Sequence, residues 1–280
     1  MNSRRSIRSS FSLFLTISLI PGFLLTIVLS LMPAAAASAG DRLPDAAQIA
    51  RWSRAALHPD LSNTRTLEIE VRSADGSAVT WIARQARKNV AGMPSQLTVL
   101  ESPASVAGIA ILAEASDDSM EALWVYIPAV QRVRRMVYEG RNENFLGTDL
   151  SVQDFGFGDV HESQLTMLGQ VDIGNRMTWA LREVPLDTSG YSRIMTFVST
   201  ESYLPVRREY YDSQGALWKT QRYENVAIID GIATPLRISI INHQGGGSTE
   251  VAVREVDYAA QLDDSLFRPS ALPSMLKVAW

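Results

Sequence analysis

The sequence predicts a mainly β protein in which antiparallel strands form one strongly bent sheet or an incomplete β-barrel, with a short helix near its start. Three observations lead to this fold class. Runs of alternating apolar and polar side chains recur through the chain, clusters of turn-forming residues separate them, and the chain contains no cysteine. Without disulfides an apolar core must hold the fold, and the apolar residue content of 46% allows a large one.

Residues 1–39 have the composition of a secretory signal peptide. Arg4, Arg5 and Arg8 form a basic region, residues 11–32 are almost entirely apolar, and 37–39 supply the small residues of a cleavage site. Removing this segment takes the formal net charge from −4 to −7, because it holds three arginines and no acidic residue. A moderately acidic chain is poorly suited to binding nucleic acid.

An uncleaved membrane anchor is the alternative interpretation of residues 11–32. This segment has 22 residues, and a spanning helix needs about 20. Pro21 and Gly22 in its middle and the alanine-rich exit favour cleavage near Ala39. We therefore expect a periplasmic protein in which residues 40–280 form a single β domain.

The predicted helix spans residues 43–57. Pro44 and Asp45 are typical of a helix start, and His58 followed by Pro59 ends the helix, because a residue before proline is pushed out of the α region. The positions at helical spacing are Ala46, Ile49, Ala50, Ser53 and Leu57.

From residue 64 onward the periodicity changes to two, which predicts strands. Leu67, Ile69 and Val71 alternate with charged residues, and the turn signal at 74–76 predicts a hairpin. Further strands are expected at 96–100, 123–127, 132–137, 177–184, 193–199, 206–211, 217–226, 236–241 and 250–258. Residues 145–159 look irregular or helical, and the glycine run 245–247 is interpreted as a flexible strand connection.

No catalytic or metal-binding constellation is visible. His58, His161 and His243 are far apart and have no histidine partner at metal-binding spacing, so no metal or other cofactor is expected. The chain has no G-x-S-x-G motif and no cysteine nucleophile. We therefore do not expect an enzyme, although two distant carboxylates that meet in a cleft are the alternative that stays open.

The predicted strand at 123–127 is apolar or aromatic on both faces. One face carries Leu123, Val125 and Ile127, and the other carries Trp124, Tyr126 and Pro128. One face can pack against the core, and the other then needs a lid, a partner, a lipid or a cavity. The alternative is that both faces are buried in an ordinary core.

The next predicted strand is basic. Arg132, Arg134 and Arg135 are typical of a solvated face or of a guarded sheet edge. The functional alternative is contact with a lipid headgroup or an acidic partner.

These residues resemble the outer membrane lipoprotein-sorting protein family, which is related to the LolA and LolB carriers. The matching positions are Trp124, Tyr126, Pro128 and Ala129, then Arg132, Arg134 and Arg135, then Phe145, Gly147 and Asp149. Residues 191–242 also follow the family's order of strands and turns. The tail after Phe267 has no assignment.

The resemblance implies a LolA-like incomplete antiparallel β-barrel, with a strongly bent sheet around a hydrophobic cavity and short helices as plug or lid. It further implies a non-enzymatic periplasmic carrier of lipid or lipoprotein acyl chains, working with an RND-type exporter. An RseB-like lipid sensor that regulates a protein partner is the alternative. The cavity candidates are Trp81, Trp124, Tyr126, Phe145, Leu146 and Phe155, and it stays open which face of the sheet they line.

Overall fold

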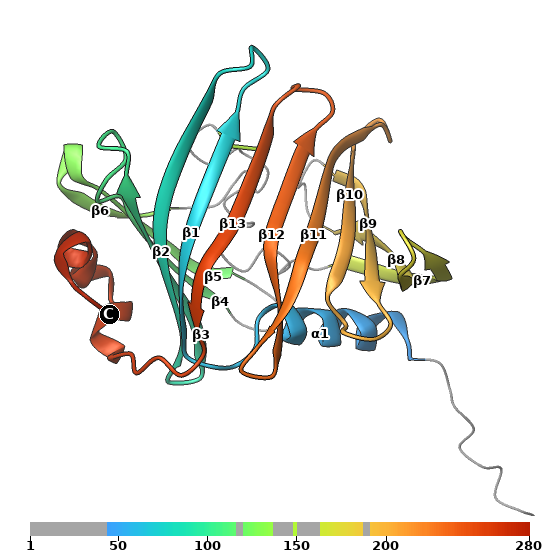
Figure 1. Ribbon diagram of the computed structural model, residues 1–280, viewed down its shortest axis with the longest axis horizontal. Coiled ribbons are helices and arrows are strands. Elements are labelled where there is room, and N and C mark those ends of the chain that lie inside the picture. Colours follow the sequence, from blue (N-terminus) through green and yellow to red (C-terminus); the bar gives the residue numbers. More distant parts are fainter. Residues whose placement is uncertain (1–43, 116–119, 137–147, 150–162, 187–190) are drawn as a thin grey trace, which may run out of the picture. The chain divides into compact units, whose positions relative to one another are not determined.

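The structure is a computed structural model, and it describes residues 44–115, 120–136, 148–149, 163–186 and 191–280. These residues belong to one compact unit, Leu43–Trp280. Thirteen strands form one sheet in the order β6-β5-β4-β3-β2-β1-β13-β12-β11-β10-β9-β8-β7 (Figure 1). Neighbouring strands are antiparallel throughout, and within the described residues β6 and β7 form the two ends of an open sheet. The predicted fold class is confirmed.

The strands follow the predicted pattern closely. They are β1 (Asn63–Arg72), β2 (Ala78–Val90), β3 (Met93–Ser102), β4 (Ala110–Ala115), β5 (Met120–Ile127), β6 (Arg132–Arg135), β7 (Ser163–Asp172), β8 (Met177–Pro185), β9 (Tyr191–Ser199), β10 (Pro205–Asp212), β11 (Leu217–Ile229), β12 (Ile232–Asn242) and β13 (Ser248–Asp257). The expected hairpin joins β1 to β2, and Gly76 adopts the positive φ of 85° that its turn requires.

Two strands were missing from the sequence prediction. β4 has almost every residue buried on both faces and is rich in alanine, so it has no alternation to detect. β7 is an edge strand in which no residue is fully buried, and Gly169 interrupts its pattern at a register shift. Both cases are strands whose periodicity is hidden by their position in the sheet.

Helix α1 (Ala46–Leu57) begins and ends as the sequence predicts. The side chain of Asp45 accepts a hydrogen bond from the Gln48 amide over 2.7 Å, and His58 is the C-cap residue. Ile49, Ser53 and Leu57 are buried against the sheet. Within the described ranges, no helix combines the length and the apolar character needed to cross a membrane.

We call inner the face of the sheet on which α1 lies. Ile238 of β12 packs both against the apolar cluster of this face and against the group that includes Leu57 of α1. The buried members of the cluster are Leu67, Ile69, Val71, Trp81, Ala83, Leu100, Ile109, Ile111, Ala113, Ala115, Leu123, Val125, Ile240, Val251 and Val253. They come from β1–β5, β12 and β13, which are neighbouring strands in the bent sheet of Figure 1, so the inner face of this part of the sheet is apolar.

On the opposite, outer face, the C-terminal segment covers the part of the sheet formed by β3–β6. Its short helices η3 (Asp264–Phe267) and η4 (Pro269–Lys277) bury Phe267, Leu272 and Met275 against β3 and β4. Arg84 of β2 holds the tail, because its guanidinium donates to the Val278 carbonyl over 3.0 Å and to the Met275 carbonyl over 3.3 Å. The tail that the sequence left unassigned is therefore a cover for the outer apolar face.

Candidate functional site

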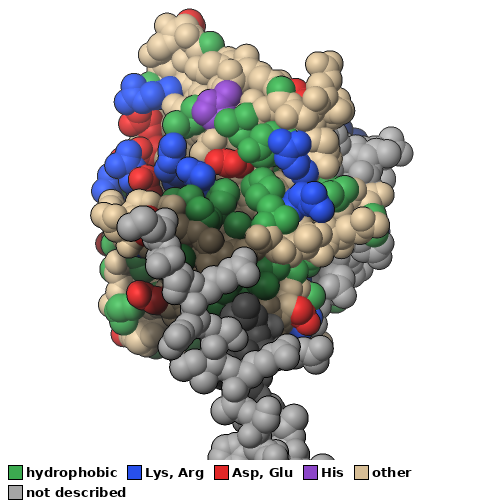
Figure 2. Space-filling view, turned by 90° about the vertical axis from the view of Figure 1, so that its right-hand side faces the viewer, with side chains coloured by type: hydrophobic (Ala, Val, Ile, Leu, Met, Phe, Trp, Pro, Cys, Tyr) green, Lys and Arg blue, Asp and Glu red, His purple; other side chains and the backbone are tan. Residues whose placement is uncertain are grey.

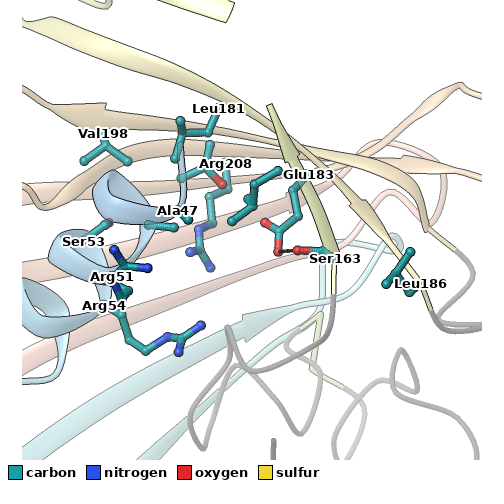
Figure 3. Close-up of a pocket in the computed structure, with 13 residues that line it drawn as sticks. Ala47, Arg51, Ser53, Arg54, Ser163, Leu181, Glu183, Leu186, Val198 and Arg208 are labelled. Atoms are coloured by element: carbon teal, nitrogen blue, oxygen red, sulfur yellow. Dashed lines mark hydrogen bonds between the residues drawn. The ribbon is translucent and has the colours of Figure 1, made fainter. Parts of the chain in front are cut away.

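A cavity of about 390 Å³ lies between α1 and the strands β7–β10 on the inner face (Figure 3). Its size falls within the range of roughly 300–1,000 Å³ that is usual for small-molecule sites. It is lined by Ala47, Ala50, Arg51, Ser53, Arg54, Ser163, Leu165, Leu181, Glu183, Leu186, Thr196, Val198 and Arg208. The helix and the sheet contribute different chemistry to it.

The basic side of the cavity comes from α1 and β10. Arg51 and Arg54 are three residues apart on the helix and share the cavity side with the small residues Ala47 and Ala50. Arg208 reaches the cavity from β10, where it pairs in register with Thr196 of β9. Three arginines therefore face one ligand-sized space.

Among the described residues that line the cavity, the carboxylate is that of Glu183 on β8. The side-chain hydroxyl of Ser163 on β7 donates to its Oε1 over 3.1 Å (Figure 3). The described charged side chains of the lining, three arginines and one glutamate, carry a net of two positive charges.

The sheet side of the cavity is mostly apolar. Leu165, Leu181 and Val198 come from β7, β8 and β9, and Leu186, which is 58% exposed, lies at its edge. Hydrophobic side chains also gather on the surface beside Lys and Arg side chains on this side of the molecule (Figure 2). The cavity and its surroundings are amphipathic.

Thr196 is the polar group on this apolar side. It is 4% exposed, and its hydroxyl has no hydrogen-bond partner among the described residues. A buried hydroxyl without a partner is unfavourable by about 1–3 kcal/mol. Thr196 thus offers a hydrogen bond to whatever occupies the cavity.

Further positively charged side chains lie near the C-terminal end of α1, around His58. The guanidinium of Arg87 contacts Nδ1 of His58 and Oε1 of Gln96. Burial, and then the positive charges of Arg87, Arg65, Arg208 and Arg54, lower the pKa of His58 well below its ordinary value of 6.5. His58 is therefore neutral at pH 7, in a region where several cations gather.

A second polar cluster lies at the other end of the strands, around Asp149. Asn242 of β12 donates from Nδ2 to Asp149 Oδ1 over 3.0 Å, and Lys219 of β11 donates from Nζ to the Asp149 carbonyl over 3.1 Å. The amide of Asp149 donates to the Thr249 hydroxyl over 3.0 Å. Asp149, 6% exposed, is thereby fixed to three strands.

The glycine run 245–247 serves this cluster, which corrects the interpretation as a flexible connection. A Cβ on Gly247 would lie 2.8 Å from Asp149 Oδ2, and one on Gly245 would lie 2.7 Å from Asn242 Nδ2. The Gly245 amide also donates to Asn242 Oδ1 over 2.7 Å. The glycines are needed because the hairpin packs directly against the two side chains.

The structure separates the predicted cavity residues. Trp81 lies in the apolar cluster of the inner face and is 5% exposed. Trp124 and Tyr126 lie on the outer face, where they pack with the C-terminal segment. Phe145, Leu146 and Phe155 lie outside the described residues. Both faces of β5 are thus packed, and Trp81 alone among the described candidates is on the inner side.

The three predicted headgroup contacts lie on the exposed edge strand β6. Arg132, Arg134 and Arg135 are all exposed. Arg134 pairs with Val125 and so belongs to the inner face, whereas Arg135 lies over the Trp124 ring at 5.8 Å on the outer face. They are not part of the cavity.

Sequence reasoning missed the three arginines of the cavity. On the helix, Arg51 and Arg54 look like ordinary solvated residues between the apolar positions. Arg208 follows Arg207 directly in the sequence. Because neighbouring residues of a strand point to opposite faces, the pair indicates no preferred face.

Three crystal structures have the same fold. A domain described as an outer membrane lipoprotein-sorting protein from Vibrio parahaemolyticus has a TM-score of 0.74 at 24% identity, with coverage of 80% of this chain and 97% of that one. A DUF1329 family protein from Desulfovibrio piger has a TM-score of 0.74 at 22% identity, with coverage of 82% and 100%. A LolA superfamily protein from Nitrosomonas europaea has a TM-score of 0.62 at 22% identity, with coverage of 81% and 98%.

The fold is therefore that of the LolA-like proteins, as the sequence resemblance predicted. The model of a protein family described as "Uncharacterized protein" matches residues 92–274, and the chain belongs to this family. No sequence among the curated proteins matches the chain.

Proposed function

We propose that the protein is a non-enzymatic periplasmic carrier that binds acyl chains of lipids or lipoproteins on the inner side of its sheet. In this proposal the predicted signal peptide directs export of the protein. The protein then acts together with an RND-type exporter in lipoprotein sorting or lipid transport. The observation that carries the proposal is the apolar cluster on the inner face of the bent sheet, together with a ligand-sized cavity under α1 on the same face.

The physical argument is one of solvation. Burial of an acyl chain is favourable by about 0.8 kcal/mol per methylene, so a lipid leaves a membrane slowly unless a protein covers its chains. A bent sheet with an apolar inner face provides such a cover without any chemical step. Helix α1 crosses the strand ends at the cavity, which is a suitable position for a plug that moves when a ligand enters (Figure 1).

The test is the ligand content of the protein purified without detergent from a Gram-negative periplasm after expression of the full chain. Native mass spectrometry should detect an added mass that organic solvent extracts as an acyl lipid. Transfer of a labelled lipid between two vesicle populations should then accelerate with protein concentration. Retention of lipid without transfer would support the sensor instead of the carrier.

A pair of tryptophan substitutions on α1 tests where the chains bind. Ala50→Trp fills the cavity that Ala50 lines, whereas Ala55→Trp places the same side chain on an exposed position of the helix. We expect the first to lower lipid occupancy severalfold and the second to leave it unchanged. Thermal unfolding of both proteins checks that the helix still docks. A chain that never contains lipid and does not take it up from vesicles would refute the carrier.

A further inference from the structure

The lining of the cavity suits a ligand that has a charged group as well as an apolar chain. Besides the apolar side chains of Leu181 and Val198, its lining includes Arg51 and Arg54 from α1 and Arg208 from β10. An acyl chain gains nothing from a cation, so three arginines around a ligand-sized space indicate a ligand that also carries an anionic group. Among anionic groups, phosphate offers the oxygens that guanidinium groups bind through paired donors.

The geometry also supplies hydrogen-bond donors of two kinds. Guanidinium groups bind phosphate oxygens through paired N–H donors. Thr196 adds a hydroxyl that is 4% exposed and has no hydrogen-bond partner among the described residues, at the cross-strand position next to Arg208. A buried donor beside an arginine, in a space of about 390 Å³, is an arrangement that an anionic ligand satisfies.

The surrounding charges strengthen this arrangement. The cations whose fields lower the pKa of His58 include Arg54 and Arg208, the same two that line the cavity. Since His58 is neutral at pH 7, the positive potential of this region comes from arginines that keep their charge over the whole physiological range.

We propose that the cavity binds a phosphate group through Arg51, Arg54, Arg208 and Thr196, and that this group is the phosphate of a lipid headgroup. The inference rests on the proposed carrier function and deepens it, because it assigns anionic phospholipids as the ligand class. The chains would extend over Leu181 and Val198, which belong to the apolar cluster between α1 and the sheet.

The experiment compares two ligands with the same acyl chains. Dioleoyl phosphatidylglycerol carries a phosphate and dioleoylglycerol does not. The full chain is purified from the periplasm and exchanged against each lipid. We expect its affinity for dioleoyl phosphatidylglycerol to be about tenfold to hundredfold higher than for dioleoylglycerol, because hydrogen bonds to a charged group contribute this much. The preference should decline as the salt concentration rises.

Two adjacent residues provide the matched variants. Arg208 faces the cavity, whereas Arg207, its neighbour on β10, lies on the outer face over the Phe197 ring at 4.6 Å. Arg208→Gln should remove most of the preference and preserve binding of dioleoylglycerol, and Arg207→Gln should change neither. If Arg208→Gln does not fold, Arg51→Gln on the exposed surface of α1 gives the same test with a smaller expected loss.

The outcomes separate the two proposals. Equal affinity of the unaltered protein for both lipids would contradict the proposed headgroup site but not the proposed carrier function. Binding of neither lipid, with inorganic phosphate bound in an Arg208-dependent manner, would refute the carrier and assign the cavity to a free anion. Equal effects of Arg207→Gln and Arg208→Gln would show that the overall charge, and not the cavity, sets the preference.

Discussion

Asn242 donates a hydrogen bond from Nδ2 to Oδ1 of Asp149 over 3.0 Å, across 93 residues of sequence. Both side chains are buried, and Lys219 and Thr249 complete the contacts of Asp149. Asp149 belongs to the part of the sequence that resembles the lipoprotein-sorting family. Its role in the described structure is to tie its own segment to β11, β12 and β13 at the end of the sheet opposite α1.

Asp149→Ala should therefore destabilise the protein. The change leaves the buried amide of Asn242 without its acceptor, and such a loss costs about 1–3 kcal/mol in the free energy of unfolding. Denaturant titration measures it. Asp149→Asn keeps an acceptor oxygen in place and should lose clearly less. An equal loss for both variants would mean that the charge of Asp149, and not this hydrogen bond, is what stabilises the site.

Gly247→Ala should destabilise the same site by steric overlap. The added Cβ would lie 2.8 Å from Asp149 Oδ2 and 3.1 Å from the Arg72 carbonyl, and overpacking of this kind costs about 1–3 kcal/mol. A double-mutant cycle isolates the contact with the carboxylate. In the Asp149→Ala background the cost of Gly247→Ala should shrink, because only the Arg72 carbonyl is left to clash. Strict additivity of the two changes would contradict this account of the glycine.

The lowered pKa of His58 predicts a pH dependence of stability. The unfolded chain takes up a proton near pH 6.5, whereas the folded protein does so only at lower pH, so the unfolded state binds more protons in between. The free energy of unfolding should therefore fall as the pH drops below 6.5, by up to about 1.4 kcal/mol per pH unit from this group.

Comparison with His58→Asn isolates that contribution from the carboxylates. Asparagine retains an acceptor for the Arg87 guanidinium but does not titrate. Urea unfolding at pH 7.5, 6.5 and 5.5 should show a shallower decline for the variant. Parallel pH profiles of the two proteins would mean that His58 is protonated equally easily in the folded and unfolded states.

The C-terminal segment should detach when Arg84 is removed. Arg84→Met eliminates the hydrogen bonds to the Met275 and Val278 carbonyls and the contact with the Trp280 ring, which lies 4.1 Å from the guanidinium carbon. We expect faster proteolysis within residues 268–280 and a loss of about 1–3 kcal/mol. Arg254→Met is the control, because the Arg254 and Glu68 side chains form an exposed ion pair, and such a pair contributes about 1 kcal/mol or less. Equal protease sensitivity of the two variants would contradict the role of Arg84.

Much of the fold could be predicted because its signals are local. The Asp45 cap and Pro59 fix α1 within a few residues, and alternation along strands such as β1 and β13 depends only on which side chains meet the core. β4 escaped detection because its burial on both faces erases alternation, and β7 because an edge strand buries too little. The resemblance carried by Trp124, Tyr126 and the arginines of β6 predicted the LolA-like fold, yet these residues lie on the outer face or on the edge of the sheet.

The candidate site could not be predicted from the sequence, for a different reason. Whether Arg207 or Arg208 faces inward depends on the register of β10 against β9, and that register is set by long-range pairing and a bulge. The contact of α1 with β7–β10, the glycine hairpin around Asp149, and the tail over the outer face likewise join residues far apart in the chain. The sequence by itself determined most of the element types and the open antiparallel fold. Only the tertiary structure decided which face is inner and which cations share a cavity, because both depend on the bending and pairing of strands that local periodicity does not encode.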